Sequence, residues 1–225
     1  MIKIENAEVF GWEAAIRGMR NPMNSWDKSD TRWTDEYCDE SKWIDYDYGS
    51  GQVKVVGEND LKLMQQLSKA GSDHGKFLRM INVTMDVTAP LYWWKEFDTY
   101  KVGTVANSCS TMHKIHAKEF TLDDFSYEHL AQENVWLLED VIRRLNTCRA
   151  FFIEDQNKSH WWQMIQLLPS SYNQRRTVQL NYQVLKSMYF ARKNHKLDEW
   201  RDLCKWMEEL PYFKEICIEP MEGKA

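Results

Sequence analysis

The stretch Phe77-Leu-Arg-Met-Ile-Asn-Val-Thr-Met-Asp-Val-Thr88 has the clearest secondary-structure pattern in this chain. From residue 81 onward, apolar and polar side chains alternate without a break. Because successive side chains of a β-strand point to opposite faces of a sheet, this alternation predicts a strand over 77–88 with one buried face. The residues expected on the buried face are Ile81, Val83, Met85 and Val87.

Helical patterns follow this strand and dominate the rest of the chain. Pro90 suits the first turn of a helix. An aromatic-rich helix is therefore predicted over 91–100, with Leu91, Trp94 and Phe97 at helical spacing. Beyond residue 113, apolar periodicity predicts four further helices, over 123–152, 160–168, 172–192 and 197–210.

The N-terminal part of the chain mixes strand and helix signals. Strands are predicted over 1–10 and 52–56, and a short helix over 11–20. A second helix is expected to start at a cap formed by Asn59 or Asp60 and to end at Gly71.

Residues 21–50 are polar, charged and aromatic, and are predicted to form a long structured loop with helical turns. Loops of this length are often lids or binding segments, but an insertion that only covers the core fits equally well. No repeat, low-complexity tract or Gly/Ser linker divides the chain. We therefore expect a single α+β domain over 1–225, with a central, mainly antiparallel sheet flanked by long helices and 21–50 as an insertion or lid.

Composition narrows the class of protein. The 225 residues carry a formal net charge of -5, which gives no general electrostatic footprint for nucleic acid. The five cysteines are odd in number and include no CxxC pair, so a disulfide framework is not expected and a reducing cytosol fits. The chain begins without an apolar signal-peptide core and has no membrane-spanning apolar run. We expect a cytoplasmic protein without membrane or nucleic-acid partners.

The segment Phe97-Asp-Thr-Tyr-Lys-Val-Gly-Thr-Val-Ala-Asn-Ser-Cys-Ser-Thr-Met-His113 abandons hydrophobic periodicity. Its small and hydroxylated residues offer many hydrogen-bonding groups and allow close approach to the backbone. Polar segments carried by a rigid scaffold are frequent binding sites. A solvated Ser/Thr loop accounts for the same composition.

The order of residue types in this segment resembles the signature of flavin-dependent thymidylate synthases. That signature reads Arg-His-Arg, two residues, Ser, one residue, Asn-Glu, one residue, Ser, one residue, Arg. The alignment allows one extra residue before Asn107, and it keeps Asn107, a positive charge at Lys101 and the hydroxyl groups. The arginines, the histidine and the glutamate of the signature are replaced. The aligned residues are Thr99, Tyr100, Lys101, Thr104, Asn107, Ser108, Ser110 and Met112.

A second region strengthens the resemblance. A Leu-Pro break opens the helix predicted over 172–192, whose first turns carry Arg175 and Arg176. Arginines near a helix N-terminus suit a phosphate group, although a solvent-exposed arginine pair is equally compatible. In the family, a Leu-Pro-hydrophilic-aromatic segment precedes an Arg and then a long helix with an Asn and a second Arg. The matching residues here are Leu168, Pro169, Tyr172, Arg175, Asn181 and Arg192.

Two further positions match the family pattern ahead of the signature. A His-x-Ser-Pro-Phe-Glu-His box precedes the family's alternating strand, and 73–79 occupies that place here, keeping Phe77 and a displaced His74. A Gln usually stands three residues before the first Arg of the signature, and Glu96 stands there in this chain.

The resemblance implies methylation of dUMP to dTMP with FAD, NADPH and methylenetetrahydrofolate, by a homotetramer whose active sites are shared between subunits. Arg192 would be catalytic, holding the uracil carbonyl, and no metal is implied. The implied dUMP-binding residues are Glu96, Thr104, Ser108, Ser110, Arg175 and Arg192. The implied FAD-binding residues are His74, Arg79, Thr99, Tyr100, Lys101, Asn107 and Asn181.

Other interpretations remain open. A protein with this fold can bind a nucleotide or flavin and have altered or lost its pyrimidine-modifying activity. Cys109, His113 and His116 are residue types that bind zinc, although a fourth ligand is not evident. Cys109 with His113 could also form a nucleophile–base pair, without a third member.

Overall fold

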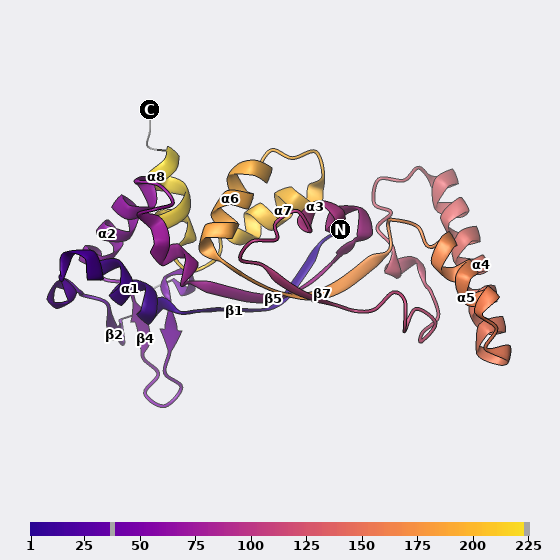
Figure 1. Cartoon of the computed structure of the whole chain (residues 1–225), viewed down its shortest axis with the longest axis horizontal. Coiled ribbons are helices and arrows are strands. Elements are labelled where there is room, and N and C mark those ends of the chain that lie inside the picture. Colours follow the sequence, from indigo (N-terminus) through magenta and orange to yellow (C-terminus); the bar gives the residue numbers. More distant parts are fainter. Residues whose placement is uncertain (37–38, 223–225) are drawn as a thin grey trace. The chain divides into compact units, whose positions relative to one another are not determined.

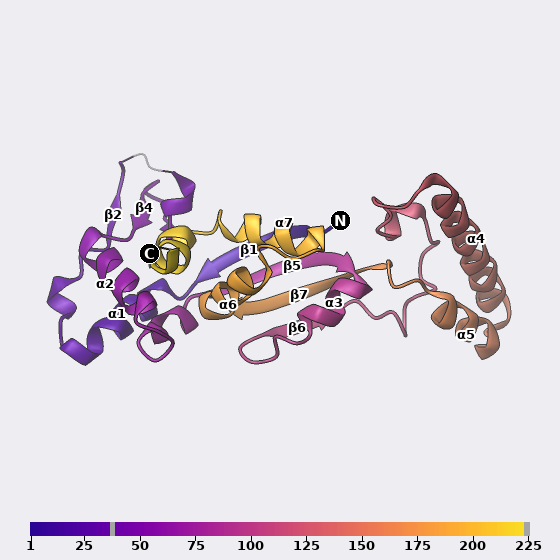
Figure 2. The same cartoon turned by 90° about the horizontal axis from the view of Figure 1, so that it is seen from above.

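The computed structural model describes residues 1–36 and 39–222 of the chain, so Cys38 lies outside the described residues. It contains a four-stranded sheet with the strand order β1-β5-β7-β6. Figure 2 shows β1, β5 and β7 side by side with alternating directions. The predicted α+β class with a mainly antiparallel sheet is confirmed. The strands are β1 (Lys3–Phe10), β5 (Asn82–Pro90), β6 (Val105–Ser108) and β7 (Asn173–Asn181).

The chain divides into two compact units, each assembled from separate segments. The first unit contains Met1–Glu5, Asp86–Thr99 and Ala106–Thr177. The second contains Asn6–Met85, Tyr100–Val105 and the described residues from Val178 onward. The limits of these segments fall inside each strand of the four-stranded sheet. The expectation that residues 1–225 form a single domain stays a prediction.

Strand β5 confirms the alternation expected from the sequence. Ile81 precedes it, and Ile81, Val83 and Val87 are fully buried, whereas the polar residues between them are partly exposed. The strand starts later than predicted, at Asn82, because Gly75–Arg79 form the 3-10 helix η4. Phe77 is buried, as a core residue would be, but it belongs to this helix and not to the strand.

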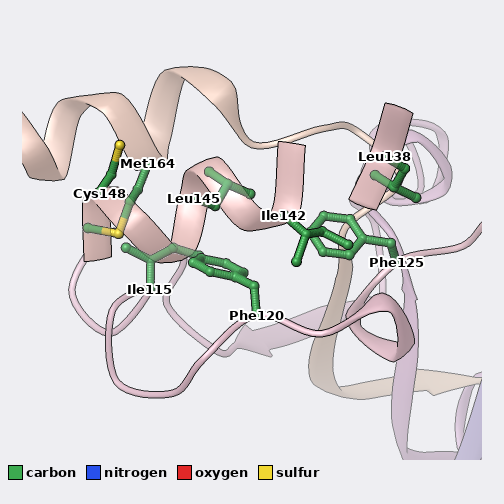
Figure 3. Close-up of a cluster of buried hydrophobic side chains, with 8 residues drawn as sticks. All are labelled: Ile115, Phe120, Phe125, Leu138, Ile142, Leu145, Cys148 and Met164. Atoms are coloured by element: carbon green, nitrogen blue, oxygen red, sulfur yellow. The ribbon is translucent and has the colours of Figure 1, made fainter. Parts of the chain in front are cut away.

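The first unit is built on α3 (Leu91–Phe97), α4 (Gln132–Asp155) and α5 (Lys158–Leu167). Helices α4 and α5 lie side by side as a hairpin (Figure 1). Their inner side chains form one buried cluster with the segment that follows the signature region (Figure 3). The members of this cluster are Ile115, Phe120, Phe125, Leu138, Ile142, Leu145, Cys148 and Met164.

Two predicted helices of this unit have different limits. Helix α3 ends at Phe97 rather than at residue 100. Helix α4 begins at Gln132 rather than at residue 123, because 122–124 form the separate 3-10 helix η5 with a capping box between Thr121 and Asp124. The predicted helix over 160–168 is present as α5.

The second unit packs its helices around buried aromatic residues. Tyr182, the first residue of α6, is fully buried and donates a hydrogen bond to the Pro211 carbonyl at 2.8 Å. Its ring meets Trp12 and Phe213 edge-on, at centroid distances of 5.6 and 5.3 Å. The helices are α1 (Trp12–Arg20), α2 (Glu58–Lys69), α6 (Tyr182–Arg192), α7 (Asp198–Met207) and α8 (Glu219–Glu222), with the π-helix η6 (Lys214–Ile218).

A continuous helix over 172–192 was predicted, and this prediction is wrong. Residues Asn173–Asn181 form β7, and α6 starts only at Tyr182. Gln174, Val178 and Leu180 are buried and Arg176 is half-buried, whereas the residues between them are exposed, an alternation that a helix would not produce. The Asn181 side chain accepts a hydrogen bond from the Val184 amide at 3.1 Å and so caps α6.

The segment 21–50 is more regular than the predicted loop. It contains the 3-10 helices η1 (Asn21–Met23), η2 (Trp26–Lys28) and η3 (Glu40–Lys42) and two short strands. The strands β2 (Arg32–Thr34) and β3 (Asp45–Tyr46) pair antiparallel with either side of β4 (Val53–Val55). The predicted strand over 52–56 is therefore present as the centre of a second sheet.

A buried ion pair joins this segment to α1 and α2. Arg20 Nε donates to Asp60 Oδ1 at 2.7 Å, and the two residues are only 3% and 0% exposed. The other oxygen of Asp60 accepts from the hydroxyl groups of Ser29 and Thr31, both at 2.7 Å. Asp60 is therefore an anchor inside α2 and not its cap, which is Gly57. Burial alone would raise the pKa of Asp60, but these hydrogen bonds and Arg20 hold it below the ordinary value.

None of the helices in the described chain combines the length and the apolar character that crossing a bilayer requires.

We predict that Asp60→Ala lowers the free energy of unfolding by about 3–5 kcal/mol, because Arg20 is left buried without its partner. Urea denaturation measures this loss. The contribution of Asp60 is complete at neutral pH and is lost as the pH falls below 3.8 toward the lowered folded-state pKa, so the two curves should converge in acid. Glu58→Ala removes an exposed ion pair with Lys62 and should cost less than about 1 kcal/mol. Equal losses in both variants would contradict the anchoring role.

Candidate functional site

A cleft of about 540 Å³ opens in the first unit, at the end of β5 and the start of β7. The irregular segment 109–124 forms most of its wall. Two residues assigned from the resemblance, Ser110 and Arg175, lie in its lining. The remaining lining residues are Thr88, Cys109, Thr111, Lys114, Ile115, Lys118, Phe120, Asp123, Asp124, Tyr172, Asn173 and Gln174.

Side chains from α4 and α5 fix this irregular wall by hydrogen bonding to its backbone. Trp161 Nε1 donates to the Met112 carbonyl, and Arg149 Nε donates to the His116 carbonyl, both at 2.9 Å. The Asn146 side chain bonds both the amide and the carbonyl of Phe120 at 2.8 Å. The wall is thus held in place although the short 3-10 helix η5 is its only helix or strand within the described residues.

A buried glutamine supports the cleft from β7. Gln174 is only 7% exposed, and its Nε2 donates to the Cys109 carbonyl at 2.8 Å. Its Oε1 accepts from Arg176 Nε at 3.0 Å, and the Arg176 guanidinium lies 4.1 Å from the ring centre of Trp94. The Cys109 amide also donates to the Arg175 carbonyl at 2.9 Å. These contacts set the position of the residues next to Ser110.

The two arginines of β7 do not lie at a helix N-terminus, so the predicted combination of arginine and helix dipole is wrong. Arg175 projects from the strand and donates to Asp86 at 2.7 Å. This hydrogen bond, and the charge of Asp86, raise the pKa of Arg175 above its ordinary value. Arg176 pairs with Asp98 at 2.6 Å. Both charges are therefore partly neutralised by neighbouring carboxylates.

Other residues assigned from the resemblance also lie in the first unit. Ser110 Oγ accepts hydrogen bonds from the amides of Met112 and His113, at 3.2 and 2.9 Å. The Thr99 hydroxyl donates to the Glu96 carbonyl at 2.7 Å. Asn107 and Ser108 are exposed on β6.

In the second unit, the signature segment contacts α6. Arg192 Nε donates to the Tyr100 hydroxyl at 3.1 Å. The guanidinium of Arg192 lies 4.8 Å from the ring centre of Trp200 and 5.8 Å from that of Tyr100. These contacts place the planar cation against two neighbouring aromatic rings, whose centres are 5.9 Å apart.

The loop that follows Tyr100 lies against the N-terminus of α6. Gly103 has φ +76°, and a β-carbon there would meet Asn181 Nδ2 at 3.1 Å and Val184 Cγ2 at 3.2 Å. Glycine is therefore favoured both by its backbone conformation and by the close approach. The Thr104 hydroxyl is buried and has no hydrogen-bond partner among the described residues. A buried hydroxyl without a partner is uncommon and is one mark of a functional position.

The remaining residues that the resemblance assigns to FAD have exposed side chains. Lys101 makes no ion pair with any residue of the described ranges. His74 and Arg79 lie at η4, also exposed and without an ion pair in that part of the chain.

The zinc interpretation finds no support in the geometry. Residues 109–118 form turns instead of the helix that would align Cys109, His113 and His116. Within 1–36 and 39–222, no three His, Cys, Asp or Glu side chains are arranged to hold a metal ion. The cysteines in these ranges are free.

Sequence reasoning missed Lys114, Lys118 and Gln174. The two lysines follow the signature at a spacing of four, a signal that could have been noticed. Gln174 gives no such signal, because its importance depends on burial.

The sequence and the structure of this chain were compared with those of known proteins. No protein-family model and no curated protein sequence matches the chain. Among solved structures, thymidylate synthase X (ThyX) from Helicobacter pylori with FAD and dUMP matches with a TM-score of 0.67 and 14% identity, over 99% of this chain and 100% of that one. The chain has the fold of flavin-dependent thymidylate synthases. A second structure of the Helicobacter pylori enzyme, also with FAD and dUMP, matches with a TM-score of 0.65 and 14% identity, over 96% and 98% of the two chains. The fold expected from the thymidylate synthase resemblance is confirmed.

We predict that Gln174→Leu lowers the free energy of unfolding by about 1–3 kcal/mol, because the Cys109 carbonyl and Arg176 each lose a partner. Hydrogen exchange at the Cys109 amide should also become faster. Gln179→Leu is the matched control, since Gln179 is exposed on the same strand. An unchanged exchange rate in Gln174→Leu would show that this side chain does not hold the wall.

Proposed function

We propose that this protein is a flavin-dependent thymidylate synthase-like enzyme, which methylates dUMP to dTMP with methylenetetrahydrofolate, FAD and NADPH. The observation that carries the proposal is the contact between two segments that resemble the family independently. Tyr100 of the first segment bonds Arg192 of the second, and Gly103 lies against Asn181. A chance resemblance in two distant segments gives no reason for them to meet in this way.

The residues around this contact fit a flavin nucleotide. Tyr100 offers a planar ring, and Gly103 permits close backbone approach. Thr104 offers a buried hydroxyl without a partner among the described residues, and Lys101 an exposed cation. FAD would supply the redox chemistry, with NADPH as reductant and methylenetetrahydrofolate as the one-carbon donor. The protein would bind and orient these molecules.

Arg192 is the residue we assign to catalysis. The hydrogen bond to the Tyr100 hydroxyl and the contact with the Trp200 ring hold the guanidinium in a fixed orientation. A cation that is already in position can stabilise negative charge developing on a pyrimidine carbonyl, because the protein does not have to reorganise during the reaction.

Polar groups of the cleft and Arg192 are the residues that the resemblance assigns to the nucleotide. Ser110 and Arg175 both line the cleft, although Arg175 also donates a hydrogen bond to Asp86. The full set assigned to dUMP is Glu96, Thr104, Ser108, Ser110, Arg175 and Arg192.

The test is formation of dTMP. We expect the purified protein to bind FAD, to show flavin absorbance, and to convert dUMP when NADPH and methylenetetrahydrofolate are supplied. Chromatography measures the product. Binding of FAD and dUMP without turnover would favour the alternative, a protein of this fold that binds nucleotides and has lost the reaction. A colourless protein that takes up no FAD would overturn the flavin assignment.

We predict that Lys101→Ala raises the dissociation constant of FAD about tenfold, which is about 1.4 kcal/mol, because a contact to the FAD phosphates is lost. Fluorescence titration measures this change. Lys95→Ala is the control, since Lys95 is also exposed. Cys109→Ser should leave FAD affinity and turnover intact, because the thiol has no covalent role in this proposal. The reverse pattern would point to a cysteine-dependent mechanism.

We also propose a cytoplasmic homotetramer with shared active sites. Large apolar side chains are exposed along α4 and α5, and exposed apolar surface commonly marks an interface. They include Trp136, Leu137, Phe151, Ile153 and Trp162, which are 43–62% exposed. Light scattering should give four times the mass of the chain, and a monomer at micromolar concentration would contradict this assembly.

A further inference from the structure

The cleft of the first unit is lined by three basic side chains with different surroundings. Arg175 donates to Asp86 at 2.7 Å, and Lys118 contacts the Asp124 carboxylate. Lys114 makes no ion pair with any residue of the described chain. Its ammonium group is therefore the cleft cation that a ligand can engage without displacing a carboxylate.

The backbone that carries Lys114 is fixed on both sides. Ile115, the next residue, is 4% exposed and belongs to the buried cluster in Figure 3. The Ala117 amide donates to the Lys114 carbonyl at 3.0 Å, and the carbonyls of Met112 and His116 are held by Trp161 and Arg149. The long lysine stem starts from a rigid base, so less backbone entropy opposes binding.

The rest of the cleft suits a small molecule that combines an anionic group with a ring. Phe120 and Tyr172 contribute aromatic surface, and Ser110 and Thr111 contribute hydroxyl groups. Burial, followed by the charge of Asp124, raises the pKa of Tyr172 further above its ordinary value, and its protonated hydroxyl is a hydrogen-bond donor. The volume of about 540 Å³ lies within the usual range of ligand sites.

We propose that Lys114 binds the phosphate group of a nucleoside monophosphate in this cleft. Met112 stands where the family signature has its last arginine and cannot bind an anion, and Lys114 supplies a cation two residues later. The identity of the base rests on the function proposed above, whereas the recognition of phosphate does not. Asp123 also lines the cleft as an exposed carboxylate and opposes the binding of an anion.

The experiment compares Lys114→Gln with wild type by calorimetry, using dUMP, deoxyuridine and inorganic phosphate as separate probes. We expect Lys114→Gln to weaken dUMP binding about tenfold and to leave the affinity for deoxyuridine unchanged, because only the phosphate contact is lost. Lys114→Arg should restore most of the affinity. Asp123→Asn should strengthen dUMP binding, and Lys95→Gln should change nothing. Lys114 is exposed, so melting temperatures should stay equal.

The outcomes separate this inference from the proposed function. Unchanged dUMP affinity in Lys114→Gln overturns the role of Lys114 even when the protein synthesises dTMP. Binding of inorganic phosphate that depends on Lys114, in a protein that does not bind dUMP, supports the phosphate site and overturns the proposed function. A wild-type protein that binds neither dUMP nor phosphate overturns both.

Discussion

The burial of one face of β5 is the constraint on which the cleft depends. The pleat that buries Val87 places Asp86 and Thr88 on the opposite face. There Thr88 lines the cleft, and Asp86 accepts hydrogen bonds from Arg175 at 2.7 Å and from Thr177 at 2.5 Å. A shift of one residue in this strand would exchange the two faces and would remove Asp86 from Arg175. The apolar alternation therefore sets the electrostatics of the cleft as well as its position.

Both units use buried side chains to hold segments whose regular structure is limited to a short 3-10 helix. In the first unit, Asn146, Arg149 and Trp161 bond the backbone of the cleft wall. In the second, Arg20 and Asp60 bond the backbone and hydroxyl groups of 25–31. Irregular backbone cannot satisfy its own polar groups, so buried side chains must do so. The result is a loop that can present ligand-binding groups with little loss of entropy on binding.

The cations that we assign to ligand binding in the two units differ in how far the protein already satisfies them. Arg175 is paired with a carboxylate, Arg192 lies against two aromatic rings, and Lys114 is left without an ion pair within the described ranges. A cation that already has a partner gives up part of its interaction when it binds a ligand, whereas an unpaired one does not. In the function proposed above, Lys114 would therefore offset part of the positive charge that the signature segment lacks.

The sequence alone determined the buried face of β5, the helices α1, α5 and α7, and the order of the two segments that resemble the family. These features depend on local periodicity, on proline, and on residue identity, all of which can be seen in the chain itself. It did not determine that Asn173–Asn181 form a strand, because Val178 and Leu180 are the only apolar residues of this stretch and are too few to define a period. The contacts Tyr100–Arg192 and Asp86–Arg175 join residues 92 and 89 positions apart. Only the tertiary structure decides such contacts, because strand pairing and helix packing bring together residues that no local pattern connects.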